Sequence, residues 1–253
     1  MQRHSPPDRP PPRQKPIRAA ERDDRQYPRA PDALPALPHV DADLLRAAAA
    51  RLDVVNPHRR ARVLANPHHE PQVERARRGH AREAAVLIAF RPATAGGFEL
   101  ILTERQAGLR FAGHLAFPGG HREPGDGSAA GTALRECKEE IGLAREHVTV
   151  LATLPPYFTH AGHRIDGVLA LVEASAPLAP DPREVARLVA VPAHALFDPR
   201  AYQLHRRSAQ PYRANYQWRS PGAGAPADLL VLGGPTLSLL IHLYDALARA
   251  AAH

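Results

Sequence analysis

Three glutamates near the middle of the chain have the spacing of a metal site. Glu136, Glu139 and Glu140 stand at positions i, i+3 and i+4, which share one face of a helix. Like charges at this spacing repel, at about 0.2–0.5 kcal/mol for each i,i+4 pair, so helix stability alone would not select them. A divalent cation removes the conflict, because Mg²⁺ is a hard ion that takes oxygen ligands. The alternative is a surface helix with a solvated acidic face.

The residues around these glutamates predict the helix that would carry them. Ser128 is suited to cap its first turn, and Gly142 is suited to end it in a left-handed conformation. Ala133, Cys137 and Ile141 recur at i, i+4 and i+8 and form an apolar face away from the acids. The sequence therefore predicts a strand, a glycine-rich loop and an acidic helix in succession.

The segment from Gly120 to Leu143 resembles the Nudix box, usually written GX5EX7REUXEEXGU with U an aliphatic residue. The residues that match are Gly120, Arg135, Glu136, Glu139, Glu140, Gly142 and Leu143. The first acid is Asp126 rather than Glu, and the stretch from Asp126 to Arg135 is one residue longer than the pattern. In the family this acid pairs with the arginine, so the departures bear on loop geometry more than on metal binding.

A second motif, before the box, resembles the coenzyme A pyrophosphatase signature LLTxR[SA]x3Rx3Gx3FPGG. The residues that match are Leu102, Thr103, Arg105, Arg110, Gly113 and the run from Phe117 to Gly120. Ile101 replaces the first Leu, Gln106 replaces the small residue, and the step from Arg110 to Gly113 is one residue short. Arg105 and Arg110 are candidate phosphate ligands, because the guanidinium fork binds phosphate bidentately. Ordinary surface arginine is the alternative.

The resemblance implies that a metal-activated water cleaves a pyrophosphate linkage. By position, Glu136 and Glu140 would be the principal metal ligands, with the Gly120 carbonyl as a further one. Glu139 would be a ligand or the general base, and Arg135 would orient the carboxylates. The expected cofactor is Mg²⁺ or Mn²⁺.

A rival for the general base is Glu184, which follows the box in the segment 181–185. A loop glutamate after the box has this role in some family members. An acid in a surface turn is the alternative. A base must reach the attacking water within hydrogen-bond distance, which the sequence alone does not establish.

Coenzyme A carries a 3′-phosphate, so a site for it should be basic. Arg105, Arg110 and Arg122 are candidates because they lie close to the box in the sequence. Tyr157 and Phe158 follow two prolines and are candidates to stack on adenine or to contact the pantetheine arm. Packing at a strand end is the commoner reason for such an aromatic pair.

Three functions compete. We expect a pyrophosphatase of coenzyme A or acyl-coenzyme A that releases 3′,5′-ADP and a 4′-phosphopantetheine species. The second interpretation is a Nudix hydrolase of another nucleoside diphosphate derivative, such as a nucleotide sugar, ADP-ribose or a dinucleotide. The third is a nucleic-acid-binding protein, whose arginine contacts would be steeply salt-dependent. Nucleic acid is disfavoured, because the basic tail lacks interleaved aromatics. The sequence leaves the acyl state of the substrate, the preferred metal and the oligomeric state open, with a homodimer as one option.

Composition agrees with a phosphorylated partner. The 253 residues carry a net charge of +7, and all but two of the 33 basic residues are arginine. Such a charge favours anionic partners. A single cysteine excludes an intramolecular disulfide and fits a reducing cytosol. With neither a secretory signal nor a membrane span in the sequence, we expect a cytoplasmic protein without membrane contact.

The chain divides into three parts. Residues 1–38 are rich in Pro and Arg and predict a disordered tail. Residues 39–80 comprise a helix at 41–52 and an irregular extension, and residues 81–253 form the expected Nudix hydrolase domain. Strands are predicted at 84–90, 98–103, 148–154 and 167–173, a turn or short helix at 184–188, and a closing helix at 237–250. These elements, with the resemblance, predict an α/β fold, a Nudix-like α/β/α sandwich with a mixed sheet.

Overall fold

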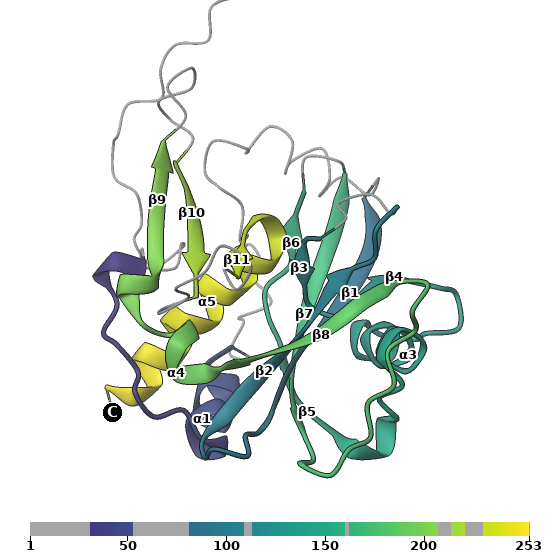
Figure 1. The fold of residues 1–253 in the computed structure, drawn as a ribbon, viewed down its shortest axis with the longest axis horizontal. Helices are drawn as coiled ribbons and strands as arrows, with labels where there is room; N and C mark the ends of the chain where they lie inside the picture. Colours follow the sequence, from purple (N-terminus) through teal and green to yellow (C-terminus); the bar gives the residue numbers. More distant parts are fainter. Residues whose placement is uncertain are drawn as a thin grey trace, which may run out of the picture.

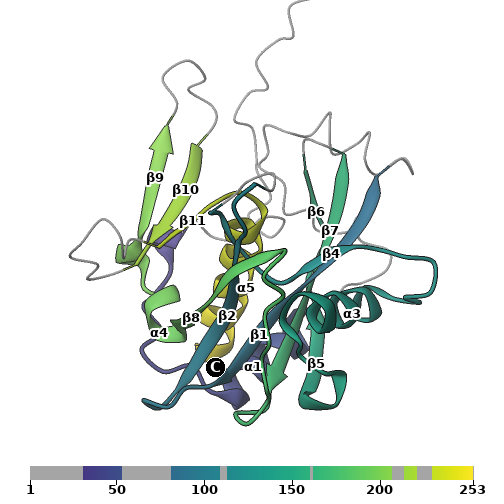
Figure 2. The same ribbon diagram turned by 45° about the vertical axis from the view of Figure 1, so that its right-hand side comes forward.

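The computed structural model describes residues 31–52, 81–108, 113–159, 162–206, 214–220 and 230–252. Within these ranges a mixed sheet stands between helices on both of its faces (Figures 1 and 2). One face is covered by α3 (Ala129–Ile141) and the other by α1 (Ala42–Leu52) and α5 (Gly234–Ala251). The predicted α/β/α sandwich is therefore confirmed.

The main sheet is built on a parallel pair of long strands. The described residues contribute β1 (Arg82–Pro92), β2 (Phe98–Arg105), β3 (Leu115–Ala116), β4 (Gly119–His121), β5 (Val148–Thr153), β6 (Tyr157–Phe158), β7 (His163–Val172) and β8 (Val185–Pro192). Their order is β3-β2-β1-β7-β5, with β4 beside β1, β6 beside β7 and β8 beside β2. β1 and β7 run parallel, whereas the other pairs are antiparallel. The sheet is therefore mixed, as predicted.

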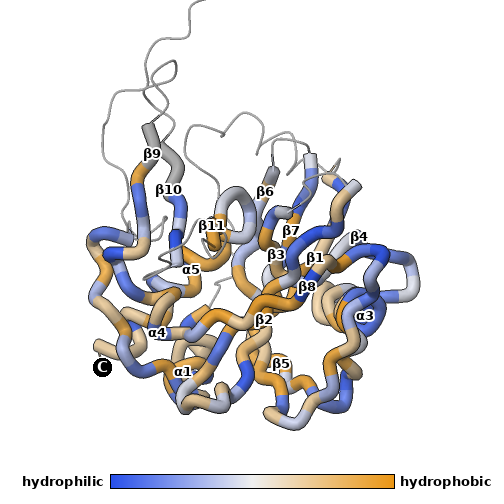
Figure 3. The backbone as a smooth tube through the Cα atoms, in the orientation of Figure 1, coloured by the Kyte–Doolittle hydropathy of each residue, from blue (hydrophilic) through white to orange (hydrophobic). Residues whose placement is uncertain are grey.

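Alternation along β1 divides the core in two. Ala85, Leu87 and Ala89 pack with the apolar face of α3, whereas Ile88 and Phe90 pack with α1 and α5. Successive side chains of a strand point to opposite faces, so a strand buried on both sides is hydrophobic almost throughout. Figure 3 shows this pattern as a largely hydrophobic course for the central strands, while α3 carries both hydrophilic and hydrophobic positions. The three α3 residues predicted to face the sheet are fully buried.

A smaller sheet lies beside α5. It consists of β9 (Tyr202–Arg206), β10 (Ala214–Arg219) and β11 (Val231–Leu232), in the order β11-β10-β9. α4 (Ala193–Leu196) and the 3₁₀ turn η5 (Pro199–Ala201) connect it to β8. Trp218 of β10 is fully buried, and its Nε1 donates to the carbonyl of Ala195 at 3.1 Å. The sequence pattern predicts no strand in this region, so the smaller sheet is seen only in the structure.

The tail that the sequence predicts does not extend to residue 38. Residues 31–38 begin with the 3₁₀ turn η1 (Pro31–Ala33), and Leu34 and Leu37 are buried in the same core as α5. The Leu37 amide donates to the carbonyl of Phe197 at 2.8 Å. Disorder was therefore wrong for residues 31–38, because two leucines find an apolar surface that lies far away in the sequence. Residues 1–30 and 53–80 lie outside the described ranges.

The segment that the sequence predicts as a turn or short helix at 184–188 is mostly strand. β8 runs through it from Val185 to Pro192 and pairs with β2, with Val189 opposite Leu102. The prediction was wrong because the partner strand lies some 80 residues earlier and supplies the ladder. Arg187 joins Glu104 of β2 in a cross-strand ion pair at 2.6 Å, a contact with no local signature.

The predicted helices form, with small shifts at their ends. Asp41 caps the first turn of α1, since the Leu44 amide donates to Asp41 Oδ1 at 2.8 Å. α5 begins at Gly234, three residues before the predicted start, and β7 begins at His163, four residues before its predicted start. In the described part of the chain, no helix is both long enough and apolar enough to cross a membrane.

Both predicted ends of α3 are confirmed. Ser128 Oγ accepts from the Gly131 amide at 3.0 Å, and Gly142 ends the helix with a φ of 68°. We expect Ser128→Ala to lower the free energy of unfolding by about 1 kcal/mol, because the first turn loses its cap. Urea denaturation measures the change, with Ser175→Ala, an exposed serine after β7, as the matched control. Equal effects of the two variants would contradict the capping role.

Candidate active site

α3 turns two of its three glutamates toward β4. The Gly119 amide donates to Glu140 Oε2 at 3.0 Å. A Cβ placed on Gly120 would lie only 2.5 Å from Glu136 Oε1, so the main chain there lies directly against the Glu136 carboxylate. Glu140 is buried at 7% exposure, whereas the side chain of Glu139 is 57% exposed. The helix period thus separates a sheltered pair, Glu136 and Glu140, from a third carboxylate at the surface.

Burial makes both sheltered carboxylates costly as anions. The pKa of Glu140 is raised from 4.5 to about 7, chiefly by burial and also by the charges of Glu136 and Glu184, against the Gly119 hydrogen bond and the charge of Arg105. Burial also raises the pKa of Glu136, against the neighbouring Arg135. Buried anions are stable only when they are paired or coordinate a cation. A bound cation would therefore stabilise the ionised forms of both carboxylates.

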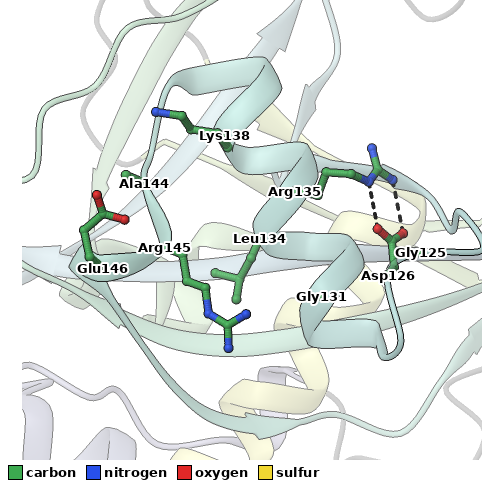
Figure 4. Close-up of a pocket in the computed structure, with 9 residues that line it drawn as sticks. All are labelled: Gly125, Asp126, Gly131, Leu134, Arg135, Lys138, Ala144, Arg145 and Glu146. Carbon is green, nitrogen blue, oxygen red and sulfur yellow. Dashed lines mark hydrogen bonds and ion pairs between the residues drawn. The ribbon is translucent and has the colours of Figure 1, made fainter.

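Arg135 connects the loop before α3 to its acidic face. Its guanidinium donates to Asp126 through Nε at 2.8 Å and Nη2 at 3.2 Å, a fork visible in Figure 4. It also donates to Glu139 at 2.9 Å, to Glu136 at 3.1 Å and to the carbonyl of His121 at 2.8 Å. One side chain therefore holds two of the three glutamates and the end of β4 in a common arrangement.

The departures from the Nudix box leave this pairing in place. The Asp126 side chain is only 4% exposed, and its Oδ2 also accepts from the Glu123 amide at 2.8 Å. Hydrogen bonds from Arg135 and from Glu123 hold the pKa of Asp126 well below its usual range. The carbonyl of Asp126 lies 1.9 Å from where a Cβ of Gly131 would stand, so the loop lies tightly on the first turn of α3. A shorter acid in a longer loop still reaches the arginine.

The donors at this site suit a hard cation. Among the residues that the structure describes, no three Asp, Glu, His or Cys side chains gather closely enough to hold a metal ion by themselves. The site offers oxygen donors from the Glu136 and Glu140 carboxylates and from the main chain at Gly120. Because Gly120 has no side chain, its main chain lies close to the Glu136 carboxylate. Mg²⁺ keeps several waters and takes substrate phosphate oxygens, so two carboxylates and a carbonyl are enough protein ligands for it.

Glu184 stands in the turn before β8, at the edge of this acidic face. Its amide donates to the carbonyl of Asp181 at 3.1 Å, and its carbonyl accepts from the Gln106 amide at 2.9 Å. Its side chain is exposed, and its charge contributes to the raised pKa values of Glu136 and Glu140. The structure therefore brings Glu184, predicted from sequence as a rival base, close to the predicted metal ligands.

The predicted basic residues occupy different places. Arg105 ends β2, and its charge opposes the raised pKa of Glu140, so it lies near the acidic face. Arg122 donates to Glu83 and, at 3.3 Å, to the carbonyl of Gly127. Arg110 lies outside the described residues. Arg105 therefore lies near the predicted metal ligands, whereas Arg122 forms an ion pair with Glu83 of β1.

The ion pair of Arg122 and Glu83 is part of a network of charged side chains that also includes Arg164 and Asp166. Arg164 and Asp166 were not singled out from the sequence. Arg164 of β7 donates to Glu83 at 3.3 Å and to Asp166 at 3.0 Å, and Asp166 is opposite Ala85 in the parallel ladder. Burial raises the pKa of Asp166, against the charge of Arg164. Residues at i and i+2 of a strand lie on the same face, so the spacing of Arg164 and Asp166 could have indicated that they interact. The strand predicted from the sequence begins only at residue 167 and leaves both residues out.

The predicted aromatic pair is engaged in packing. Tyr157 and Phe158 form β6, next to Ile165 and Arg164 of β7. Phe158 is buried, and Tyr157 packs against the larger core. Burial raises the pKa of the Tyr157 hydroxyl. Packing thus accounts for both rings, and contact with substrate remains a prediction.

Known proteins are similar to part of this chain. A family model described as the NUDIX domain matches residues 80–214, more than half of the chain. The uncharacterized Nudix hydrolase NudL of Pectobacterium atrosepticum is 38% identical over 142 residues, which cover 54% of this chain and 72% of that protein. NudL of Yersinia pestis strain Pestoides F is 36% identical over 143 residues, covering 54% and 69%. Among solved structures, a binary complex of a C. elegans Ap4A hydrolase has a TM-score of 0.37 at 26% identity, covering 43% of this chain and 79% of that one.

Proposed function

Because this chain belongs to the Nudix family, we propose that it is a metal-dependent coenzyme A diphosphatase. Nudix hydrolases act on nucleoside diphosphate derivatives and generally use divalent metal ions, and this chain is a pyrophosphohydrolase of that kind. The proposed reaction hydrolyses the pyrophosphate linkage of coenzyme A or acyl-coenzyme A. Its products are 3′,5′-ADP and 4′-phosphopantetheine or the acylated form.

One observation carries the proposal, namely the sheltered carboxylate pair beside the end of β2. Glu136 and Glu140 lie against Gly119 and Gly120, and the charge of Arg105 reaches Glu140. A pyrophosphate needs both a metal that neutralises its oxygens and a cation that grips it, and this face offers both. Arg105 also belongs to the motif that resembles coenzyme A pyrophosphatases, which favours coenzyme A among Nudix substrates.

The roles of the side chains follow from their positions. Mg²⁺ or Mn²⁺ held by Glu136, Glu140 and the Gly120 carbonyl would neutralise the phosphates and acidify a water. Arg135 keeps Glu136 and Glu139 in place through its hydrogen bonds. Arg105 binds phosphate oxygens and offsets the charge that grows on the leaving phosphate. The resemblance to the coenzyme A pyrophosphatase motif assigns the same role to Arg110.

The general base is best assigned to Glu184. The Glu139 carboxylate is already engaged, since it accepts a hydrogen bond from Arg135 at 2.9 Å. Glu184 is exposed to solvent, yet its charge acts on both predicted metal ligands. It can therefore take the proton of the attacking water from outside the metal site.

A ranking of substrates tests the proposal. We expect kcat/KM for coenzyme A or acetyl-coenzyme A to exceed that for ADP-ribose and for a dinucleoside polyphosphate by about tenfold or more, since basic side chains recognise the 3′-phosphate. Dephospho-coenzyme A, which lacks this phosphate, serves as the matched control and should be cleaved less efficiently. Preference for ADP-ribose or the dinucleotide would refute the coenzyme A assignment and leave the chain a Nudix hydrolase of another nucleoside diphosphate derivative.

A further inference from the structure

The turn that carries Glu184 is tied to α3 on one side. The Ala179 amide donates to the carbonyl of Ile141 at 2.8 Å, and the Asp181 amide donates to the carbonyl of Glu140 at 2.8 Å. These main-chain bonds connect the approach to the turn with the last turn of α3. They fix residues 179–181 beside the predicted metal ligands, but they leave the far end of the turn, where Glu184 lies, to other contacts.

Gln106 supplies the contacts on the other side. Its side-chain Nε2 donates to the carbonyl of Pro182 at 2.8 Å, and its amide donates to the carbonyl of Glu184 at 2.9 Å. Its own Oε1 accepts from the Ala107 amide at 2.9 Å. Both ends of the amide group are engaged, so this side chain is held in one orientation and bridges the end of β2 to the turn.

Strand pairing alone does not fix the turn at this point. The register of β2 against β8 shifts between Glu104 and Arg105, so Arg105 lies opposite Val185 after a bulge. A bulge interrupts the ladder and re-aims the chain locally. Gln106 lies directly beyond this interruption, where its two hydrogen bonds replace the missing ladder contacts.

The identity of the residue matters. In the coenzyme A pyrophosphatase signature that this segment resembles, the position of Gln106 carries a small residue. A serine or alanine side chain is too short to bridge from β2 to the carbonyl of Pro182. The bridge is therefore a feature of this chain's own sequence rather than of the motif.

We propose that Gln106 is a positioning residue that holds the Glu184 turn, and with it the Glu184 carboxylate, over the acidic face of α3. The proposal rests on the proposed function, because it takes Glu184 as the base in hydrolysis. It assigns Gln106 no contact with substrate. Gln106 acts on the rate through the place at which Glu184 meets the attacking water.

The test compares Gln106→Ser, Glu184→Gln and the double variant. For Gln106→Ser we expect kcat to fall about three- to tenfold, the size of one lost hydrogen bond, while KM stays within about twofold. The double variant should be no slower than Glu184→Gln alone, because Gln106 acts through Glu184. Gln217→Ser is the matched control, since Gln217 is also half-buried and its side chain accepts a hydrogen bond from Arg219 in the smaller sheet. It should leave kcat unchanged.

Losses that multiply in the double variant would overturn the proposal, as would an unchanged kcat in Gln106→Ser. Hydrogen exchange separates this failure from failure of the proposed function. Amides of residues 181–187 should exchange faster in Gln106→Ser than in the wild type, and not faster in Gln217→Ser. Unchanged exchange there would overturn the positioning role whatever substrate the protein cleaves. Faster exchange without cleavage of coenzyme A would instead count against the substrate assignment only.

Discussion

Glu140→Gln is expected to lower kcat about a thousandfold, or about 4 kcal/mol of transition-state stabilisation, while leaving the metal-free protein at least as stable as the wild type. The amide cannot serve as an anionic metal ligand. Its carbonyl oxygen can still accept from the Gly119 amide, as Glu140 Oε2 does at 3.0 Å. The variant therefore removes the charge and keeps the shape.

The stability side of this prediction follows from the pKa of Glu140. Burial is the main cause that raises this pKa from 4.5 to about 7. Between these two pH values the Glu140 carboxyl is therefore protonated in the folded state and ionised in the unfolded state. The free energy of unfolding of the metal-free wild type should therefore fall as pH rises from about 4.5 to about 7, by roughly 3 kcal/mol at most. Glu140→Gln removes this dependence.

Urea denaturation in the presence of a chelator, at several pH values between 5 and 8, measures the pH dependence of the free energy of unfolding. Steady-state turnover with metal present measures the loss of kcat. Glu146→Gln, an exposed glutamate in the 3₁₀ turn η4 (Arg145–His147), is the control and should keep the wild-type pH dependence and turnover. Turnover by Glu140→Gln near that of the wild type would mean that α3 does not carry the metal.

Gly120→Ala is expected to lower turnover at least about a hundredfold with little loss of stability. The new Cβ would lie 2.5 Å from Glu136 Oε1 and 2.6 Å from its Cδ, so the carboxylate must move. The carboxylate is the end of a flexible side chain, so the fold accommodates the change while the metal ligand is displaced. A misplacement of about 1 Å costs a factor of this size when a group must be aligned with a reacting atom.

Gly125→Ala is the matched control for this variant. Gly125 lies in the loop before α3, and nothing lies within 4 Å of a Cβ placed there. We expect turnover within about twofold of the wild type, since the added methyl group meets no other atom. Turnover, Mn²⁺ titration and melting temperature are the measurements for both variants. Equal turnover in the two variants would show that hydrolysis does not depend on the position of the Glu136 carboxylate beside β4.

The parts of the structure that the sequence predicted have local causes. The span of α3, its Ser128 cap and its left-handed end at Gly142 follow from side chains within one or two turns of each other. The strand predicted at 84–90 likewise follows from a local run of residues and lies within β1. The family resemblance added the Asp126–Arg135 pair, which joins residues on either side of a loop and has no periodic signature of its own.

The parts that the sequence did not predict depend on distant partners. β8 is a strand because β2 pairs with it, and residues 31–38 are ordered because Leu34 and Leu37 meet the core that contains α5. The bond from Gln106 to Pro182 joins residues 76 positions apart in the sequence. In the sequence, Gln106 is only a departure from a motif, because its partner is adjacent to it only when β2 and the turn before β8 lie side by side.

The most direct test of the central claim is the product pattern from coenzyme A with Mg²⁺ or Mn²⁺, resolved by chromatography for the wild type and for Glu140→Gln. We expect 3′,5′-ADP and 4′-phosphopantetheine from the wild type, both abolished by a chelator and both missing in the variant. Intact coenzyme A after incubation of the wild type with either metal would refute the coenzyme A diphosphatase assignment, and equal product from Glu140→Gln would refute the role of Glu140 as a metal ligand.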